Sequence, residues 1–176
     1  MTAPVLGKLE WQLASAVPEL LAEPTRDALG DLPAYAVAID PELADTAAFC
    51  AEYDVPMAAS ANCVIVLGKR GGESSYAAVL VLADDRADVN GVIRKHLGVR
   101  KISFAAQDDA VSTTGMEYGG ITPIGLPAEW PVLVDEGVVQ AGLVVIGSGI
   151  RASKILIDGA ELAKLPSATV LALAQR

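Results

Sequence analysis

The sequence predicts a single α+β domain, and three observations indicate it. The 176 residues are a usual length for one domain. Several apolar runs have the length of strands and adjoin short glycine-rich turns, as in hairpins. Segments with helical spacing lie between them without the regular strand–helix alternation of a parallel sheet. No internal repeat or long linker divides the chain, so we expect residues 1–176 to form one domain.

The first third of the chain predicts two helices separated by a strand. Residues 8–22 carry apolar side chains at roughly helical spacing and predict a helix that Pro18 interrupts. Residues 23–34 are rich in proline and glycine and predict a connection. A strand is expected at 34–39 and a helix at 42–53.

The middle of the chain predicts a hairpin followed by a capped helix. Residues 62–67 and 76–82 are apolar and β-branched, and the polar, glycine-rich segment 68–73 between them predicts the turn. Asp88 is a typical N-cap residue, and Gly98 is typical of a helix end, so a helix is expected through Leu97.

The last third alternates loop and short elements. A glycine- and proline-rich loop is expected at 115–129. The other predicted elements are helices from Asp108 or Asp109 to 114 and from Asp158 to 165, and strands at 101–104, 131–135, 143–146, 154–157 and 170–173.

Charge and hydropathy limit the classes of function. The net charge of −9 argues against general nucleic-acid binding. Residues 69–104, however, carry seven bases against four acids. This basic stretch is either a phosphate-contacting patch or an ordinary solvated helix end. The apolar runs are shorter than the roughly 20 residues of a membrane span, and no secretory pattern is present, so we expect a cytoplasmic protein without a membrane partner.

The sequence predicts neither a metal nor a nucleotide cofactor. Cys50, Cys63 and the single histidine, His96, are not clustered as metal ligands. We interpret the two cysteines as small buried hydrophobes.

One segment imitates a dinucleotide-binding motif. Gly147–Ala152 reads G-x-G-x-x-A after an apolar run. Strand-like residues return at 155–157, and only 27 residues follow Gly149, too few for a nucleotide domain. A glycine-rich hairpin turn is the favoured interpretation.

The loop Gly115–Pro127 is the most informative segment, because it reads Gly-Gly, two residues, Pro, one residue, Gly-Leu from Gly119 to Leu126. Glycine adopts positive φ and admits a ligand close to the backbone, and Pro123 stiffens the loop. Inward N–H groups could stabilise an ester oxyanion. The alternative is a tight connection that binds no ligand.

This loop resembles the signature loop of the YbaK-type family of aminoacyl-tRNA editing hydrolases, which includes the insertion editing domain of bacterial prolyl-tRNA synthetases. Further features follow in the family's order: a strand ending in Asp135-Glu136, a strand into Gly147-x-Gly-x-Arg151, and an acidic-capped helix. The resemblance covers residues 45–165, and residues 1–40 are an N-terminal extension or cap.

The resemblance implies a mixed, largely antiparallel, barrel-like sheet surrounded by helices. It implies a trans-editing hydrolase that deacylates mischarged aminoacyl-tRNA by ester hydrolysis without a metal. The implied partners are the 3′ acceptor end of aminoacyl-tRNA and an aminoacyl-tRNA synthetase.

The resemblance also implies the site residues. Those in a catalytic role are Asn62, Gly119, Gly120, Pro123 and Gly125. Those in substrate binding are Ile121, Thr122, Asp135, Gly147, Ser148, Gly149, Arg151 and Lys154. Gly120→Ala is expected to slow hydrolysis more than it affects folding.

The chain departs from the family at one position. Asn62 stands where family members usually carry a lysine at the start of the first core strand. Asparagine hydrogen-bonds but has no charge for the tRNA terminal phosphate. Lys69, Lys101 or Lys154 could compensate. The alternative function is a binding module for aminoacyl-tRNA, an amino acid or a related small molecule that has lost the chemistry.

Overall fold

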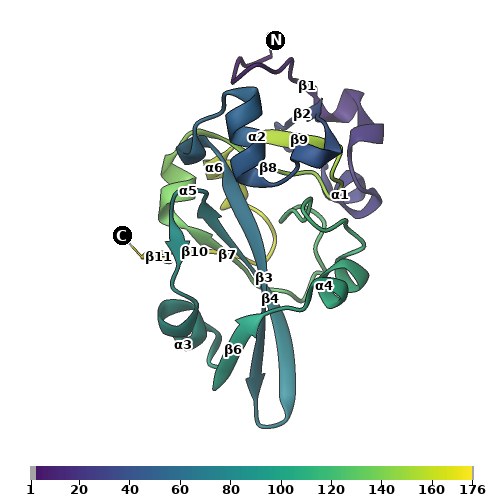
Figure 1. Cartoon of the computed structure of the whole chain (residues 1–176). Coiled ribbons are helices and arrows are strands. Elements are labelled where there is room, and N and C mark those ends of the chain that lie inside the picture. The colour runs from purple at the N-terminus through teal and green to yellow at the C-terminus, as the bar shows by residue number, and fades with distance from the viewer. Residues whose placement is uncertain (1–2, 176) are drawn as a thin grey trace.

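The computed structural model describes residues 3–175 as a mixed α+β fold (Figure 1). The described residues form one five-stranded, one four-stranded and one two-stranded sheet. The five-stranded sheet has the order β10 (Ala168–Leu171), β7 (Val132–Asp135), β4 (Glu73–Leu82), β3 (Ala61–Arg70), β6 (Lys101–Phe104). The four-stranded sheet has the order β1 (Gln12–Leu13), β2 (Tyr35–Ala38), β9 (Ser153–Asp158), β8 (Leu143–Gly147), and the small sheet pairs β11 (Ala174–Gln175) with β5 (Arg86–Ala87).

Most strand pairs are antiparallel, and β7 is parallel to both β4 and β10. The two larger sheets meet at a single parallel bridge between Ser60 and Val145. Each sheet is open at both edges within residues 3–175, so the mixed α+β architecture is confirmed but closure into a barrel is not.

Short helices surround the sheets, with bounds α1 (Glu23–Ala28), α2 (Thr46–Tyr53), α3 (Arg94–Leu97), α4 (Gln107–Thr114), α5 (Glu136–Gln140) and α6 (Gly159–Leu162). The predicted cap at Asp88 is confirmed, since its carboxylate accepts from the N–H groups of Gly91 and Val92. The turn that follows, Val89–Ile93, is a π-helix that continues into α3, and Gly98 ends it at φ 67°. None of the helices in the described part of the chain is long and apolar enough to cross a membrane.

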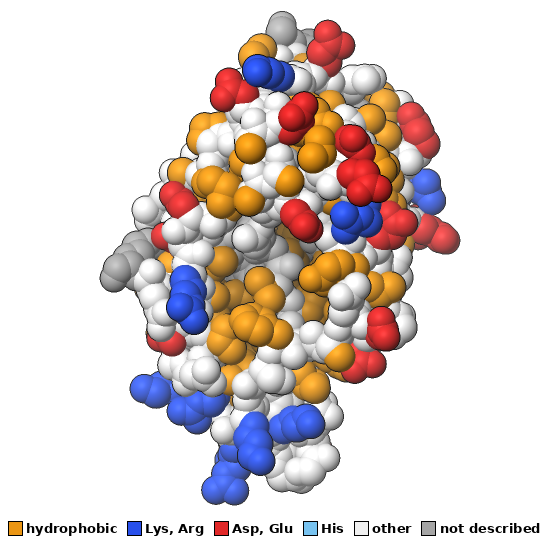
Figure 2. Space-filling model, viewed as in Figure 1, with side chains coloured by type: hydrophobic (Ala, Val, Ile, Leu, Met, Phe, Trp, Pro, Cys, Tyr) orange, Lys and Arg blue, Asp and Glu red, His pale blue; other side chains and the backbone are white. Residues whose placement is uncertain are grey.

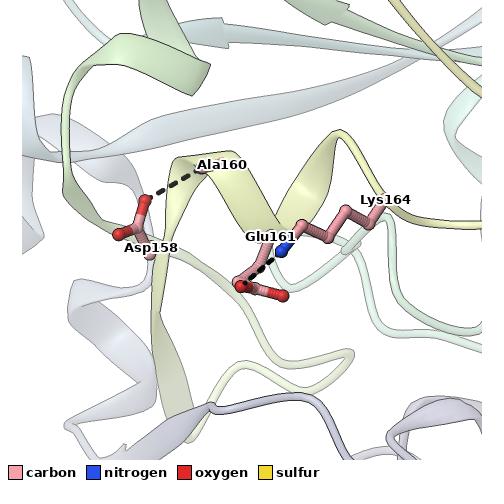
Figure 3. Close-up of polar contacts among 4 residues, drawn as sticks. All are labelled: Asp158, Ala160, Glu161 and Lys164. Carbon is pink, nitrogen blue, oxygen red and sulfur yellow. Dashed lines mark hydrogen bonds and ion pairs between the residues drawn. The ribbon is translucent and has the colours of Figure 1, made fainter.

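The cap of α6 is also confirmed, but the helix is shorter than predicted. Asp158 accepts from the N–H of Ala160 at 2.9 Å, and α6 ends at Leu162 rather than 165 (Figure 3). Lys164 follows the helix and forms an ion pair with Glu161 at 3.0 Å (Figure 3). The Lys164 side chain is exposed, so this pair contributes little to stability.

The helix predicted at 8–22 is wrong. This segment forms β1 and two 3-10 turns at Ala14–Ala16 and Pro18–Leu20, and the first helix, α1, lies in the predicted connection. Proline explains both differences. Pro18 has no N–H for a helix interior, whereas Pro24 occupies the first turn of α1, where no N–H is needed.

The β3–β4 hairpin is longer than predicted. Pairing continues to Arg70 and Glu73, so only Gly71 and Gly72 form the turn, at φ 57° and 83°. Positive φ at both positions is typical of the type I′ turn, whose twist matches the strands. Residues 69–75 are exposed, and the hairpin extends as an arm at the bottom of Figure 1.

The hydrophobic core lies on both faces of β4. Ala78 and Leu80 pack in the largest cluster with residues of β7, β8 and β9, while Ala77, Val79 and Val81 pack in another with Ile93 and Leu133. This alternation is the period-two pattern of a strand that is buried on both sides. The first cluster forms the floor of the site described below.

Candidate functional site

A cavity of about 520 Å³ opens where β3, β8 and the loop before Ile121 meet. Figure 2 shows a recess in the middle of this face with hydrophobic side chains around it. Its apolar wall combines Cys63, Ile65, Ala110, Ile121 and Ile146. Its other lining residues are Ala44, Asp45, Thr46, Ser60, Ala61, Asn62, Val64, Phe104, Ala105, Gln107, Tyr118, Gly119, Val145, Gly147 and Lys154.

Two glycine turns, at 119–121 and 147–149, form one side of the cavity, and their backbones are in direct contact with each other. The N–H of Gly149 donates to the carbonyl of Gly120 at 2.6 Å. A Cβ on Gly147 would lie 2.5 Å from the carbonyl oxygen of Gly120, and one on Gly120 would lie 2.6 Å from that of Ile150. Real side chains do not tolerate such distances, so glycine is required at both positions for packing. The turn at 147–149 joins antiparallel β8 and β9, which confirms a hairpin and excludes the dinucleotide motif.

The close contact changes the expectation for Gly120→Ala, because the methyl group would push the two turns apart. We expect the substitution to lower the free energy of unfolding by about 2–3 kcal/mol, as overpacked sites do. Urea denaturation measures this. Gly142→Ala is the control, since no atom lies within 4 Å of its added Cβ and any loss there reports only the strain of its positive φ, 78°. Equal losses for both variants would contradict the packing argument.

Asn62 lies at the start of β3 and lines the cavity. Its Oδ1 accepts a hydrogen bond from Thr46 Oγ1 at 2.6 Å, which fixes the amide at the first turn of α2. The NH2 group of Asn62 has two donors that can serve a ligand, and Oδ1 retains one acceptor site. No pattern in the sequence indicated a role for Thr46, which is an ordinary residue at a helix start.

Lys154 also lines the cavity, and it is buried, with a relative exposure of 7%. Strand β9 holds it in register between Val37 of β2 and Gly147 of β8. Its Nζ donates to the carbonyl of Ala44 at 2.9 Å and lies 5.4 Å from the centroid of the Phe49 ring. An ammonium group has three donors, so this cation can bind a further acceptor.

Burial sets the protonation of Lys154. Desolvation is the main cause that lowers the pKa of Lys154, and with the opposing effects of Cys50 and Asp45, which raise it, and of the Arg151 charge, which lowers it, the pKa is about 8. The amine is therefore mostly charged at neutral pH. Of the three lysines that could compensate for Asn62, Lys154 alone reaches the cavity, since Lys69 and Lys101 face each other on exposed parts of β3 and β6.

The second half of the loop lies outside the cavity lining. Thr122 and Pro123 are buried, and Gly125, at φ 100°, packs against the backbone of Pro24. Gly125 thus holds this half of the loop against α1. Of the predicted site residues in this loop, Gly119 and Ile121 line the cavity.

The segment before α1 supports the other glycine turn from outside. Gly149 packs against Ala22, whose N–H donates to the carbonyl of Ser148 at 3.0 Å. The Ser148 hydroxyl is buried and lies 2.6 Å from that of Ser153, which in turn donates to the carbonyl of Leu20. Ser148 and Gly149 thus hold the turn in place without lining the cavity.

Asp135 and Arg151 are likewise absent from the lining. Asp135 is fully buried, caps α5 and accepts from the N–H groups of Leu173 and Ala174. Arg151 donates to the carbonyls of Tyr118 and Pro41, so it connects the glycine loop to the 3-10 turn Pro41–Leu43 that precedes α2.

Cys63 is a cavity residue that the sequence did not single out as one. Burial raises the pKa of its thiol to about 12, so the sulfur is neutral at physiological pH and forms apolar wall. Within residues 3–175, no group of three or more His, Cys, Asp or Glu side chains is placed to hold a metal ion.

The described residues thus form an open α+β fold with a cavity walled by two backbone turns. A family model described as an aminoacyl-tRNA editing domain matches residues 40–165. The chain belongs to this family, and the YbaK-type resemblance is confirmed.

Solved structures share the fold. A candidate trans-editing enzyme for prolyl tRNA synthetase is similar with a TM-score of 0.75 and 20% identity, over 88% of this chain and 97% of that one. The hypothetical protein APE2540 has a TM-score of 0.76 and 21% identity, over 87% and 100%. A candidate signal transduction protein from Marinobacter aquaeolei VT8 has a TM-score of 0.59 and 17% identity, over 87% of this chain but 30% of its own.

Proposed function

We propose that this protein hydrolyses the ester of mischarged aminoacyl-tRNA in trans, in the cytoplasm and without a metal. The observation that carries the proposal is the buried ammonium group of Lys154 beside the glycine turns, in a chain of the aminoacyl-tRNA editing family. It supplies inside the cavity the positive charge that Asn62 lacks.

The cavity matches both ends of the reacting group. An aminoacyl-adenosine terminus carries a cationic α-ammonium and an anionic phosphate. Among the described residues, the lining includes one carboxylate, Asp45, and one ammonium, Lys154. We assign Asp45 to the α-ammonium, Lys154 to the phosphate, and the NH2 group of Asn62 to a ribose hydroxyl. The apolar wall receives the side chain of the amino acid.

The glycine loop supplies the oxyanion donors. The N–H of Gly120 donates to the carbonyl of Glu117 at 3.0 Å, so it is already occupied. We assign this role to the N–H groups of Gly119 and Ile121, the glycine-loop residues that line the cavity. Water adds to the ester carbonyl, the bond from the acyl carbon to the ribose oxygen breaks, and that oxygen leaves as a hydroxyl with a proton from the water.

The proposal is tested with a panel of mischarged tRNAs, measuring the amino acid released over the uncatalysed rate. Release from at least one member is expected. A second candidate function, a binding module for aminoacyl-tRNA or an amino acid, is favoured by the uncharged Asn62. It becomes the better description if aminoacyl-tRNA binds but stays intact. The proposal includes a partner in editing, an aminoacyl-tRNA synthetase. Adding the synthetase to the assay tests this, and it should increase the rate at which the amino acid is released.

Asn62→Lys tests the departure from the family directly. A second cation in the cavity should tighten binding of aminoacyl-tRNA and steepen its dependence on salt by about one unit of log–log slope. Filter binding at several salt concentrations measures this. Asn62→Gln is the control, because it lengthens the side chain without adding charge. Identical salt slopes for both variants would show that position 62 does not face a phosphate.

A further inference from the structure

A cluster of cations lies at the end of the molecule opposite most of the acidic residues. Figure 2 shows Lys and Arg side chains gathered at the lower end of this face and most of the Asp and Glu side chains on its upper half. We call the lower cluster the basic end and define it as Lys69, Arg70, Arg94, Lys95, Arg100 and Lys101, all of them exposed except the half-buried Arg94.

The fold brings these residues together from three segments. Lys69 pairs with Lys101 across β3 and β6, and the N–H of Arg100 donates to the carbonyl of Lys69 at 2.9 Å. The Arg70 side chain donates to the carbonyl of Gly98 at 3.0 Å. A groove of about 500 Å³ runs between β3, β6 and the π-helical turn, with Lys69, Arg94, Arg100 and Lys101 in its lining.

Repulsion within the basic end lowers the stability of the fold. Like charges directly opposite each other on neighbouring strands repel, and Lys69 faces Lys101. No residue of the basic end forms an ion pair with a carboxylate within residues 3–175. A groove lined by Arg and Lys side chains without carboxylate partners, in a protein of net charge −9, is suited to an anionic partner with regularly spaced charges.

The distance from the cavity fits a nucleic acid whose 3′ end occupies the cavity. Strand β3 connects Asn62 at the cavity to Lys69 at the basic end, seven residues or about 23 Å along an extended strand. Stacked nucleotides rise about 3.4 Å each, so this span corresponds to about seven nucleotides. With the terminal adenosine in the cavity, the basic end lies beside the duplex that follows the short single-stranded 3′ end.

We propose that the basic end binds the phosphate backbone of the acceptor duplex of the same tRNA whose 3′ end occupies the cavity. This inference rests on the proposed function. It adds a second, sequence-independent contact, which positions the duplex while the cavity selects the acyl group.

The test compares two variants with the same net charge. Lys69→Gln, Arg100→Gln and Lys101→Gln together neutralise the basic end, and Lys8→Gln, Arg26→Gln and Lys164→Gln neutralise exposed cations elsewhere. Each triple change takes the net charge from −9 to −12, by loss of three positive charges. Thermal melts check that both variants fold.

The first readout is binding of deacylated tRNA, which does not depend on hydrolysis. The basic-end variant should bind about tenfold more weakly at moderate salt, with a log–log salt slope lower by about two to three units, whereas the control keeps the wild-type slope. Equal weakening of both variants, or no weakening of the basic-end variant, would overturn the proposal. The proposal would also be overturned if the basic-end variant bound tRNA as well as the wild type but no longer bound anionic vesicles or an acidic protein partner.

The second readout separates this surface from the cavity. A short aminoacylated single-stranded oligonucleotide that ends in CCA reaches the cavity but not the basic end. The basic-end variant should cleave it with wild-type kcat/KM, and should cleave full aminoacyl-tRNA with a raised KM and unchanged kcat. A loss on the short substrate as well would overturn the proposal. If the wild type cleaves neither substrate, the proposed function fails, and the binding experiment still decides the role of the basic end.

Discussion

Lys154→Met is expected to lower kcat/KM for aminoacyl-tRNA deacylation about 10²–10³-fold, the effect of removing one well-placed electrostatic contact. The folded protein should be more stable, by about 1–2 kcal/mol at pH 7, because a buried charge is replaced by an apolar side chain of similar length. Deacylation assays and urea denaturation measure the two effects. Loss of activity together with higher stability is not what a merely structural lysine would show.

The matched control for Lys154→Met is a variant that places a positive charge at another position of the cavity. Asn62→Lys in the Lys154→Met background restores one ammonium group at the position where the family usually has it. We expect part of the lost activity to return. If the double variant is as inactive as Lys154→Met while it still folds, the charge itself is not what Lys154 contributes.

The pKa of Lys154 gives this prediction a pH signature. The folded value of about 8 lies below the ordinary value of 10.5, so between them the unfolded chain binds a proton that the folded protein does not. Wild-type stability should therefore gain a contribution from Lys154 as pH rises from about 8 to 10.5, and Lys154→Met should lack it. Substrate binding should weaken over the same rise, because the ammonium loses its charge.

Asp135→Ala is expected to have the largest effect on folding. It removes the acceptor of three backbone N–H groups, those of Gly137 at 3.0 Å, Leu173 at 2.8 Å and Ala174 at 3.1 Å. Each buried donor left unpaired costs about 1–3 kcal/mol, so the sum of about 3–9 kcal/mol is comparable with the whole stability of a typical domain. Thermal or urea unfolding measures it.

Asp158→Ala is the control for Asp135, since both residues cap short helices. Asp158 is exposed and accepts from a single N–H, that of Ala160. Its loss should cost about 1 kcal/mol, the usual value of an N-cap. Comparable losses for the two variants would show that the C-terminal contacts of Asp135 add nothing to its role as a cap.

Local signals in the sequence predicted those parts of the fold that short-range physics decides. Asp88 and Gly98 mark helix ends because their preferred conformations fit there, and the glycine turn between β3 and β4 is set by neighbouring residues. The segment at 8–22 failed because its apolar residues are buried by distant elements. Val17 and Leu21 are 8% and 3% exposed although they lie outside any α-helix. The parallel pairing of β7 with β4 is equally non-local.

The sequence predicted which segments form the site, and the structure shows which of their residues line the cavity. Gly119 lines the cavity, Gly120 and Gly125 are glycines because neighbouring backbones pass close to them, and Gly147 meets both descriptions. A sequence cannot distinguish these two requirements, because both forbid a side chain. Nor can it show which lysine replaces the missing charge, since Lys154 reaches the cavity through the register of β9 with β2 and β8.

Residues before position 40 support both glycine turns. The unit that folds is therefore larger than the segment that matches the family. The family match begins at residue 40, yet Ala22 and Pro24 pack directly behind Gly149 and Gly125. Strand β2 also precedes that boundary, and it is the neighbour that pairs with β9 on the side away from β8. A chain trimmed to the matched residues would leave β9 as an exposed edge ready to pair with other molecules, and its glycine turns without backing.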